Sequence, residues 1–290
     1  MESRVEHLFM KIITIRGCVK MAALLACIFH VQGSWSASFS LNPGADAFVT
    51  TGSAGDLSHN NYGAAGALSL AAPVLPSGEF QSVLQFGLAG ARSVFDAQFG
   101  VGNWSVQSVK LQLTTASPKN LMFNANAAGQ FGVSLMLNNT WTEGSGTPLA
   151  PTTTGITFST LPSFESAMDE AAGSFSYAGD LGATTYNLTL TPTLLADIQN
   201  GSTVSLRMFA EDEAVSYLFF GDRFGTVSSR PLLTIGAIPE PGVCALGLVG
   251  LGLLAWSRRT ACGDGRDPNE LATKEHRNTK GILKTWISGE

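Results

Sequence analysis

The chain has 290 residues, of which 44% are hydrophobic, 13% are charged and 32 are glycine, and its formal net charge is −5. Between Phe39 and Gly236 there are six cations and fourteen carboxylates, a net charge of −8, which argues against a nucleic acid partner because phosphate binding requires a basic surface. Few charges and abundant glycine favour strands and turns over helices, and about 200 residues suit one β-sandwich domain.

The first 38 residues have the order of a secretory signal peptide. Cations up to Lys20 precede an apolar run at 21–31, and small residues follow at 33–38. Cleavage after Ser36 or Ser38 would place serine at both the −1 and −3 positions. A buried N-terminal helix is the alternative interpretation, but an export signal is the better match to the C-terminal segment described below.

The cysteines also separate the ends of the chain from its middle. They are Cys18, Cys27, Cys244 and Cys262, so none lies in the domain at 39–236. This excludes a cysteine nucleophile or a thiolate metal site in that domain. Leu24 to Cys27 resembles a lipobox, but the preceding apolar run is too short, so lipidation is only a minor alternative.

From Ala45 onwards the hydrophobic pattern has a period of two. Val109, Leu111 and Leu113, for example, alternate with Lys110 and Gln112. Strands with one buried face and one solvent-exposed face are typical of an antiparallel sandwich. The predicted strands are Ala45–Thr51, Ala67–Ala71, Phe80–Leu88, Val106–Thr114, Phe131–Asn138, Gly155–Ser159, Thr184–Thr191, Thr203–Ala210, Val215–Phe220 and Pro231–Ile235.

Two short helices are predicted between these strands. One runs from Ser163 to Ala172. The other has Thr191 as N-cap and Pro192 at its first position, and ends at Asn200-Gly201. Threonine caps, proline at the first turn and a terminal glycine are typical helix boundaries.

Four short segments occur in an order that suggests a family. They are Asp46-Ala47-Phe48-Val49, Asn60-Asn61-Tyr62-Gly63, Trp141-Thr142-Glu143-Gly144 and Arg230-Pro231-Leu232-Leu233-Thr234-Ile235. Together they resemble the DNRLRE family, which is related to a group of carbohydrate-binding modules, over about Ala45 to Ile235. The resemblance implies a jelly-roll sandwich, a fold found beside polysaccharide-active domains and on bacterial surface proteins. The chain departs from the family in longer segments at 89–103 and 147–183 and in a loosely matching arginine motif at 81–86.

Each matched segment also has an expected structural role. Asn-Asn-Tyr-Gly is expected to turn tightly, with positive φ at Asn and Gly. Trp141 is expected to pack in a core, and Glu143 to accept hydrogen bonds from nearby backbone N–H groups. Pro231 is expected to begin an edge or terminal strand, where no ladder donor is needed.

Candidates for chemistry in the domain are few. His59 is the one histidine between Ala37 and Pro268 and lies in a loop, so a Ser-His-Asp site is not favoured. Carboxylates for glycoside hydrolysis could come from Glu143, Glu165, Asp169, Glu170, Glu211, Asp212 and Glu213. The run Glu211-Asp212-Glu213 is most simply a solvated turn, and the alternative is an oxygen-ligand calcium site that includes Asp222.

Sugar binding would require flat aromatic faces together with polar partners. The exposed candidates are Tyr62, Trp104 and Tyr177, and Arg207 and Arg223 would serve an acidic glycan. Aromatic residues on alternating strand positions are more often core residues, so this is the weaker hypothesis.

The segment from Pro239 to Arg259 has three parts in a fixed order. Pro239-Glu240-Pro241 is extended because proline fixes φ and restricts the preceding residue. The uncharged run 242–257 follows, and Arg258-Arg259 ends it. An apolar helix stopped by paired arginines is typical of a membrane segment with its cytoplasmic side at the arginines. The core of this run, residues 243–256, reaches only about 21 Å as a helix, short of a hydrocarbon layer of about 30 Å, and a buried core helix is the alternative.

These three parts together resemble a PEP-CTERM protein-sorting signal. The resemblance implies export, a temporary place in the inner membrane, and processing by an exosortase, a membrane cysteine transpeptidase that cuts near the motif. The destination it implies is the cell surface or an extracellular polysaccharide matrix. The residues 260–290 after the arginines depart from the family, whose members usually end there.

The sequence therefore predicts a signal peptide at 1–38, an all-β sandwich at 39–236, a sorting signal at 237–259 and a cytoplasmic tail at 260–290. The leading interpretation is a surface or matrix protein without enzymatic activity and without a cofactor. The alternatives are a carbohydrate-binding module docking on matrix polysaccharide and a polysaccharide-active enzyme that uses carboxylates.

Overall fold

The computed structural model describes residues 36–116, 122–124, 129–177 and 182–240. Its strands are β1 (Ala37–Leu41), β2 (Ala45–Thr50), β3 (Ala67–Ala71), β4 (Phe80–Gly87), β5 (Trp104–Thr114), β6 (Gly129–Met136), β7 (Glu170–Tyr177), β8 (Ala183–Leu188), β9 (Thr203–Ala210), β10 (Ser216–Phe220) and β11 (Leu232–Pro239). The helices are α2 (Ala89–Phe99) and α3 (Pro192–Asn200), with short 3-10 turns η1 (Leu161–Ser163) and η2 (Val227–Ser229).

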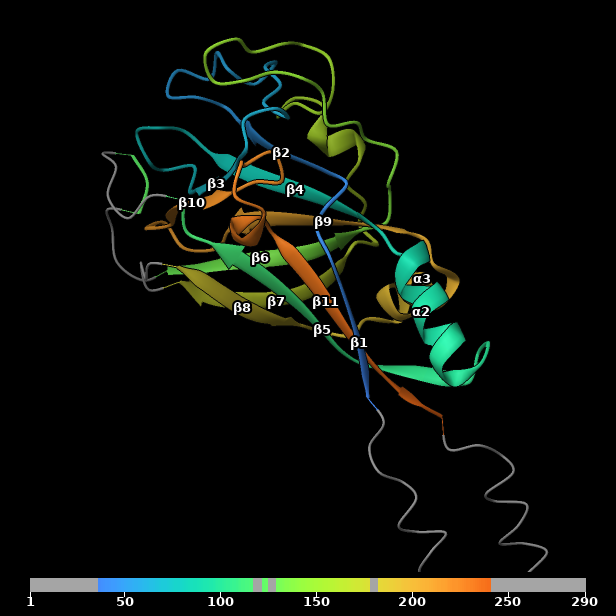
Figure 1. Ribbon diagram of the computed structural model, residues 1–290. Coiled ribbons are helices and arrows are strands. Elements are labelled where there is room, and N and C mark those ends of the chain that lie inside the picture. Colours follow the sequence, from blue (N-terminus) through green and yellow to red (C-terminus); the bar gives the residue numbers. More distant parts are fainter. Residues whose placement is uncertain (1–35, 117–121, 125–128, 178–181, 241–290) are drawn as a thin grey trace, which may run out of the picture. The chain divides into compact units, whose positions relative to one another are not determined.

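The strands form two antiparallel sheets (Figure 1). One has four strands in the order β1-β11-β5-β8. The other has seven, in the order β10-β3-β4-β9-β6-β7, with β2 paired along β4. Every strand pair is antiparallel, so the all-β antiparallel prediction is confirmed.

The main core lies between the two sheets. Leu111 on β5 and Ile235 on β11 share it with Leu84 on β4, Phe131 on β6 and Leu206 on β9. On β5 and β11 these residues alternate with half-buried or exposed neighbours, which is the period of two seen in the sequence, and it places one side of each strand inside. Burial of this apolar surface is the dominant favourable term in the fold.

The seven-stranded sheet is covered on its other face as well. Val83 on β4 points away from the main core and packs with Met136, Trp141, Ile156 and Leu161 in a second cluster. Trp141, Ile156 and Leu161 come from the long connection between β6 and β7, which crosses this face. Because Trp141 is 3% exposed and donates to Ser205 Oγ at 2.9 Å, its expected role as a core anchor is confirmed.

The helix predicted from Thr191 is confirmed. Thr191 accepts a hydrogen bond from the Leu194 N–H at 3.3 Å, Pro192 occupies the first turn, and Gly201 closes the helix with φ of +68°. An N-cap of this kind stabilises a helix by about 1 kcal/mol.

We therefore expect Thr191→Ala to lower the free energy of unfolding by about 1 kcal/mol. Thr191→Ser keeps the hydroxyl and is expected to lose much less. Urea unfolding of both variants measures the difference, and equal losses would show that the hydroxyl is not what stabilises this helix.

Two predicted elements are absent from the structure, and helix α2 and strands β1 and β7 were not predicted. Residues 163–172 are not a helix, because Asp169 accepts hydrogen bonds from the N–H groups of Leu137 and Ser166 in a turn before β7 begins. Residues 155–159 form a loop rather than a strand. Helix α2 was not predicted, although Ala91 and Phe95 have helical spacing, because Gly90 and the missing side-chain cap weaken the pattern.

The sandwich extends past both expected boundaries. Strand β1 starts at Ala37, which is buried and pairs with Ala237, two residues before the boundary expected at Phe39. Strand β11 continues past Gly236 to Pro239. Cleavage after Ser36 would leave β1 whole, whereas cleavage after Ser38 would remove two of its residues.

Candidate functional site

The start of the predicted sorting signal is part of the sandwich. Pro239 is the last residue of β11 and pairs with Trp104 on β5. The next residue, Glu240, donates its backbone N–H to the Asn103 carbonyl at 2.9 Å. Pro241, Arg258, Arg259 and the apolar run between them lie outside the described residues, as do the predicted signal peptide and the tail.

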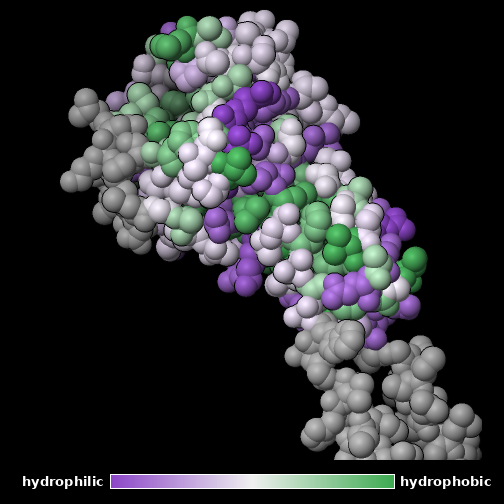
Figure 2. All heavy atoms as spheres, in the orientation of Figure 1, coloured by the Kyte–Doolittle hydropathy of each residue, from purple (hydrophilic) through white to green (hydrophobic). Residues whose placement is uncertain are grey.

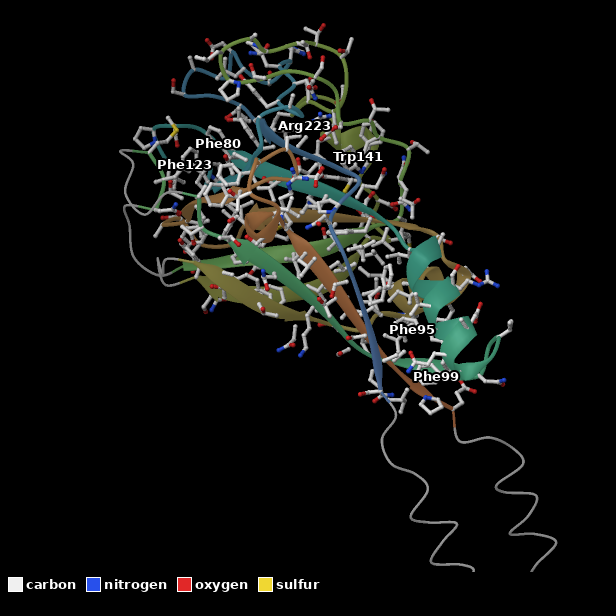
Figure 3. All side chains as sticks on the ribbon, in the orientation of Figure 1. Phe80, Phe95, Phe99, Phe123, Trp141 and Arg223 are labelled. Atoms are coloured by element: carbon white, nitrogen blue, oxygen red, sulfur yellow. The ribbon has the colours of Figure 1, made fainter. Side chains whose placement is uncertain are left out.

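Trp104 secures this end of the domain. It is 3% exposed, its ring centroid lies 5.0 Å from that of Phe95 on α2, and its Nε1 donates to Asp96 Oδ1 at 2.8 Å. This hydrogen bond is the main reason why the pKa of Asp96 lies below its ordinary value. Phe95 and Phe99 stand at the end where β1 begins and β11 finishes (Figure 3).

A second group of polar side chains joins the four segments that resemble the DNRLRE family. We call it the junction cluster: Asp46, Asn61, Glu143, Asp222, Arg223 and Arg230. Its members come from β2, from two long loops and from the connection between β10 and β11, so they are far apart in the sequence. Arg223 and Trp141 lie near one another, close to the loops over β2 and β4 (Figure 3).

Asn61 is fully buried, with 0% exposure, and makes four side-chain hydrogen bonds. Its Nδ2 donates to the carbonyl of Glu143 at 2.7 Å and to that of Ile156 at 2.8 Å. Its Oδ1 accepts from the N–H groups of Gly63 at 3.1 Å and Gly146 at 3.0 Å. The expected tight turn with positive φ at Asn and Gly is wrong, since neither has positive φ, and the asparagine instead ties three loop segments together.

Gly63 is required for close approach rather than for its backbone angle. A Cβ at this position would overlap the carbonyl oxygen of Glu143. This explains a glycine in the Asn-Asn-Tyr-Gly segment without any ligand.

Glu143 connects the loops to β2 and to Arg223. Its Oε1 accepts from the Asp46 N–H at 3.3 Å and from Arg223 Nε at 3.2 Å, and its Oε2 forms an ion pair with Arg223 Nη2. The prediction that Glu143 accepts from backbone N–H groups is therefore confirmed. The hydrogen bond to Glu143 also raises the pKa of Arg223 above its ordinary value.

Asp46 is the unusual titratable group of the cluster. It is 1% exposed, and its Oδ2 accepts from the Asp222 N–H at 2.6 Å. Burial raises the pKa of Asp46 to about 7; the Asp222 N–H opposes this, and the negative charges of Glu143 and Asp222 add to it. Asp222 in turn forms an ion pair with Arg230 at 3.7 Å, which connects the last matched segment.

The aromatic residues suggested for sugar stacking are not exposed, so that expectation is wrong. Tyr62 is 5% exposed and stacks on Phe48 with centroids 4.7 Å apart. Tyr177 is 2% exposed, and its centroid lies 4.1 Å from that of Tyr217 in the main core. Trp104 is buried against α2, as described above. The alternation that suggested these residues instead marks core positions.

The two arginines suggested for an acidic glycan already have carboxylate partners. Arg207 forms an ion pair with Glu165 and lies over the Phe209 ring at 4.7 Å. Arg223 is paired with Glu143. Both guanidinium groups thus contribute to the links between loops and sheets.

The four carboxylates suggested for calcium do not form one site. Glu211 accepts from the Ser174 hydroxyl, and Asp212 accepts from the Gln130 N–H at 2.7 Å. Glu213 is exposed, and Asp222 belongs to the junction cluster. Among residues 36–116, 122–124, 129–177 and 182–240, no three His, Cys, Asp or Glu side chains are grouped so that they could hold a metal ion.

The other candidate carboxylates are also engaged by the fold. Glu170 accepts from the hydroxyl of Thr193 at 2.9 Å, and hydrogen bonding, first from Thr191, holds the pKa of Glu170 below its ordinary value. Asp169 accepts two backbone N–H groups. His59 is exposed, and its Nδ1 lies 3.0 Å from the Ser159 hydroxyl.

Comparison with known proteins identifies the C-terminal segment. Residues 237–259 match the PEP-CTERM protein-sorting motif. No curated protein matches the chain significantly. Within the described residues, neither helix has the length and apolar character needed to cross a membrane. The chain thus carries a PEP-CTERM sorting motif at residues 237–259, which implies export and membrane-associated sorting by an exosortase.

Proposed function

We propose that this protein is an exported surface or matrix protein without enzymatic activity, and that an exosortase processes it at its C-terminal motif. The observation that carries the proposal is the match of residues 237–259 to the sorting motif. A folded sandwich immediately before the motif supplies the part that would be displayed after processing.

The sandwich itself is proposed to belong with DNRLRE-like jelly rolls. Support comes from the junction cluster, in which Asp46, Asn61, Glu143 and Arg230 of the four matched segments are joined by hydrogen bonds and ion pairs. Residues that share a structural network are expected to be retained as a set, even where each segment is short.

Binding of matrix polysaccharide is not part of this proposal. The three aromatic candidates are buried, and both arginine candidates have carboxylate partners. Binding of the processed protein to a glycan array would instead support the carbohydrate-binding alternative. Polymer-degrading activity that is lost on substituting Glu143 or Asp212 would point to the enzyme alternative.

The proposal predicts that processing depends on the Pro-Glu-Pro frame. Replacing Pro239, Glu240 and Pro241 together by alanine is expected to abolish C-terminal cleavage in cells that contain an exosortase. Mass spectrometry of protein recovered from cells and medium identifies the C-terminus. Glu213→Ala, a change to an exposed carboxylate outside the motif, is the control and is expected to be processed normally.

Unchanged cleavage of the triple alanine variant would contradict the proposal. Identical C-termini in cells with and without an exosortase gene would contradict it as well. In both cases the motif would not be read by that enzyme.

A further inference from the structure

The sorting motif starts inside a strand and has no linker before it. The match begins at Ala237, which is fully buried in β11. Ile238 pairs with Ser105, Pro239 pairs with Trp104, and Glu240 donates to the Asn103 carbonyl at 2.9 Å. Only Pro241 stands between this hydrogen-bonded segment and the uncharged run that begins at Gly242.

In this strand pair, β5 is more firmly packed than the end of β11. The β5 side is fixed by Trp104, which is buried against Phe95 and hydrogen-bonded to Asp96. On the β11 side, Pro239 and Glu240 are exposed and Ile238 is half-buried. Any separation would therefore move residues 238–240 and leave β5 in place.

Strand β1 determines how far along β11 such a separation can extend. Among the residues that the structure describes, β1 pairs with β11 only as far as Ala37 and Ala237, and residues 238–240 pair with the β5 side. The register also shifts between Gly236 and Ala237, and a β-bulge interrupts the regular ladder there. Ends of strands open at low free-energy cost compared with whole domains.

Separation of residues 238–240 from β5 would make their backbone accessible to a processing enzyme. Extended peptides are commonly held by their partners through main-chain hydrogen bonds. In the sandwich, the side chains of Pro239 and Glu240 face solvent, but the Glu240 N–H is already bonded to Asn103 and the strand before it is paired with β5. The folded domain thus presents the motif's side chains while withholding its backbone.

We propose that residues 238–240 must separate from β5 before the exosortase can process the chain, with Ala237 remaining buried as the last fixed residue. This inference rests on the proposed function and adds a conformational step to it. The β5–β11 pairing at this end would control how fast a folded, exported protein becomes a substrate. The visible face of the domain mixes hydrophobic and hydrophilic residues (Figure 2).

A disulfide across the end of the strand pair tests the proposal. Ile238→Cys with Ser105→Cys joins directly opposed residues, whose Cα separation of about 5.5 Å in an antiparallel pair suits a disulfide. Thr234→Cys with Lys110→Cys joins the same two strands away from the motif and is the matched control. Both are made in a Cys244→Ser chain, so that the native cysteine after the motif cannot compete.

The expected result is that the 238–105 pair is processed at least about tenfold more slowly than the 234–110 pair, because a covalent link between residues 238 and 105 keeps them from separating. Adding a reductant to the cells should restore processing. Equal processing of the two oxidised pairs would overturn the proposal.

A second variant needs no cysteine and does not depend on disulfide formation. Inserting Gly-Ser-Gly-Ser between Ala237 and Ile238 moves the motif off β5 while all buried residues keep their places. We expect it to be processed faster than the native chain. An unchanged rate would overturn the conformational step, whereas a native chain that is not processed at all would instead contradict the proposed function.

Discussion

Asn61→Asp is expected to lower the free energy of unfolding by about 3 kcal/mol or more at neutral pH. The change keeps the shape of the side chain but replaces its donating amide by an accepting oxygen. That oxygen would face the carbonyls of Glu143 and Ile156, which now accept at 2.7 and 2.8 Å. Each buried polar group without a partner costs about 1–3 kcal/mol, and the new carboxylate would be buried as well.

This loss is large compared with the total stability of a domain, about 5–15 kcal/mol. The variant should recover part of its stability at low pH, because a protonated aspartate can donate one of the two lost hydrogen bonds. Urea unfolding followed by tryptophan fluorescence is a suitable measurement, since Trp104 and Trp141 are both buried.

The neighbouring residue provides the control for Asn61. Asn60 is half-buried and makes one side-chain hydrogen bond, at 3.3 Å to the Tyr62 hydroxyl. Asn60→Asp is therefore expected to cost less than about 1 kcal/mol. Equal losses for the two variants would show that the Asn61 network does not hold the loops together.

The second large effect is a fall in stability between pH 5 and pH 8 caused by Asp46. Burial raises the pKa of Asp46 to about 7 in the folded protein, against an ordinary value of 3.8. Between these values the unfolded chain has lost the proton and the folded chain keeps it, so stability falls as pH rises through this window. With about 1.4 kcal/mol per pKa unit, the full effect between pH 4 and pH 7 is about 4 kcal/mol. About 3 kcal/mol of it falls between pH 5 and pH 7, and the effect is complete above about pH 7.

Asp46→Asn tests this assignment. An asparagine is neutral at every pH and can still accept from the Asp222 N–H, so the dependence on pH between 5 and 8 should flatten. His59→Gln is made in parallel, so that any part of the slope that comes from the exposed histidine is measured separately. The range starts at pH 5 because Asp96 and Glu170, whose pKa values lie below the ordinary ones, lose their stabilising contributions only in more acid solution.

A slope that persists in Asp46→Asn would contradict the assignment, because another group would then be titrating. Urea midpoints at four or five pH values are sufficient for the comparison. The sign is diagnostic, since a paired surface carboxylate would make the protein more stable as pH rises.

Local patterns in the sequence predicted much of the sandwich. Ala67–Ala71 and Thr203–Ala210 were predicted with the observed bounds, and the helix after Thr191 with its observed cap. These features depend on alternation and on capping, which act over a few residues. Helix α2 was missed for the same reason, because Gly90 weakens its local pattern and packing against β5 and β11 compensates.

The roles of single residues could be predicted from the sequence less well than the strands. Tyr62, Trp104 and Tyr177 are aromatic residues that the sequence allowed either as core or as binding surface. Only tertiary packing decides that they are buried: Tyr62 packs against Phe48, Trp104 against α2, and Tyr177 in the main core. Asn61 was predicted to make a turn through its backbone. Its actual role depends on carbonyls about 80 to 95 residues away, which no local signal reveals.

The sequence by itself identified the sorting motif, because residues 237–259 are contiguous and their match depends only on the order of residues along the chain. It also determined the antiparallel β class, through the alternation of hydrophobic and polar residues along each strand. Only the tertiary structure decided that Asp46 is buried, that four distant segments meet through Asn61, Glu143 and Asp222, and that the motif begins on a paired strand. These three properties arise from contacts between residues far apart in the chain. A side chain becomes buried, gains its hydrogen-bond partner or pairs with another strand only when the fold brings those residues together.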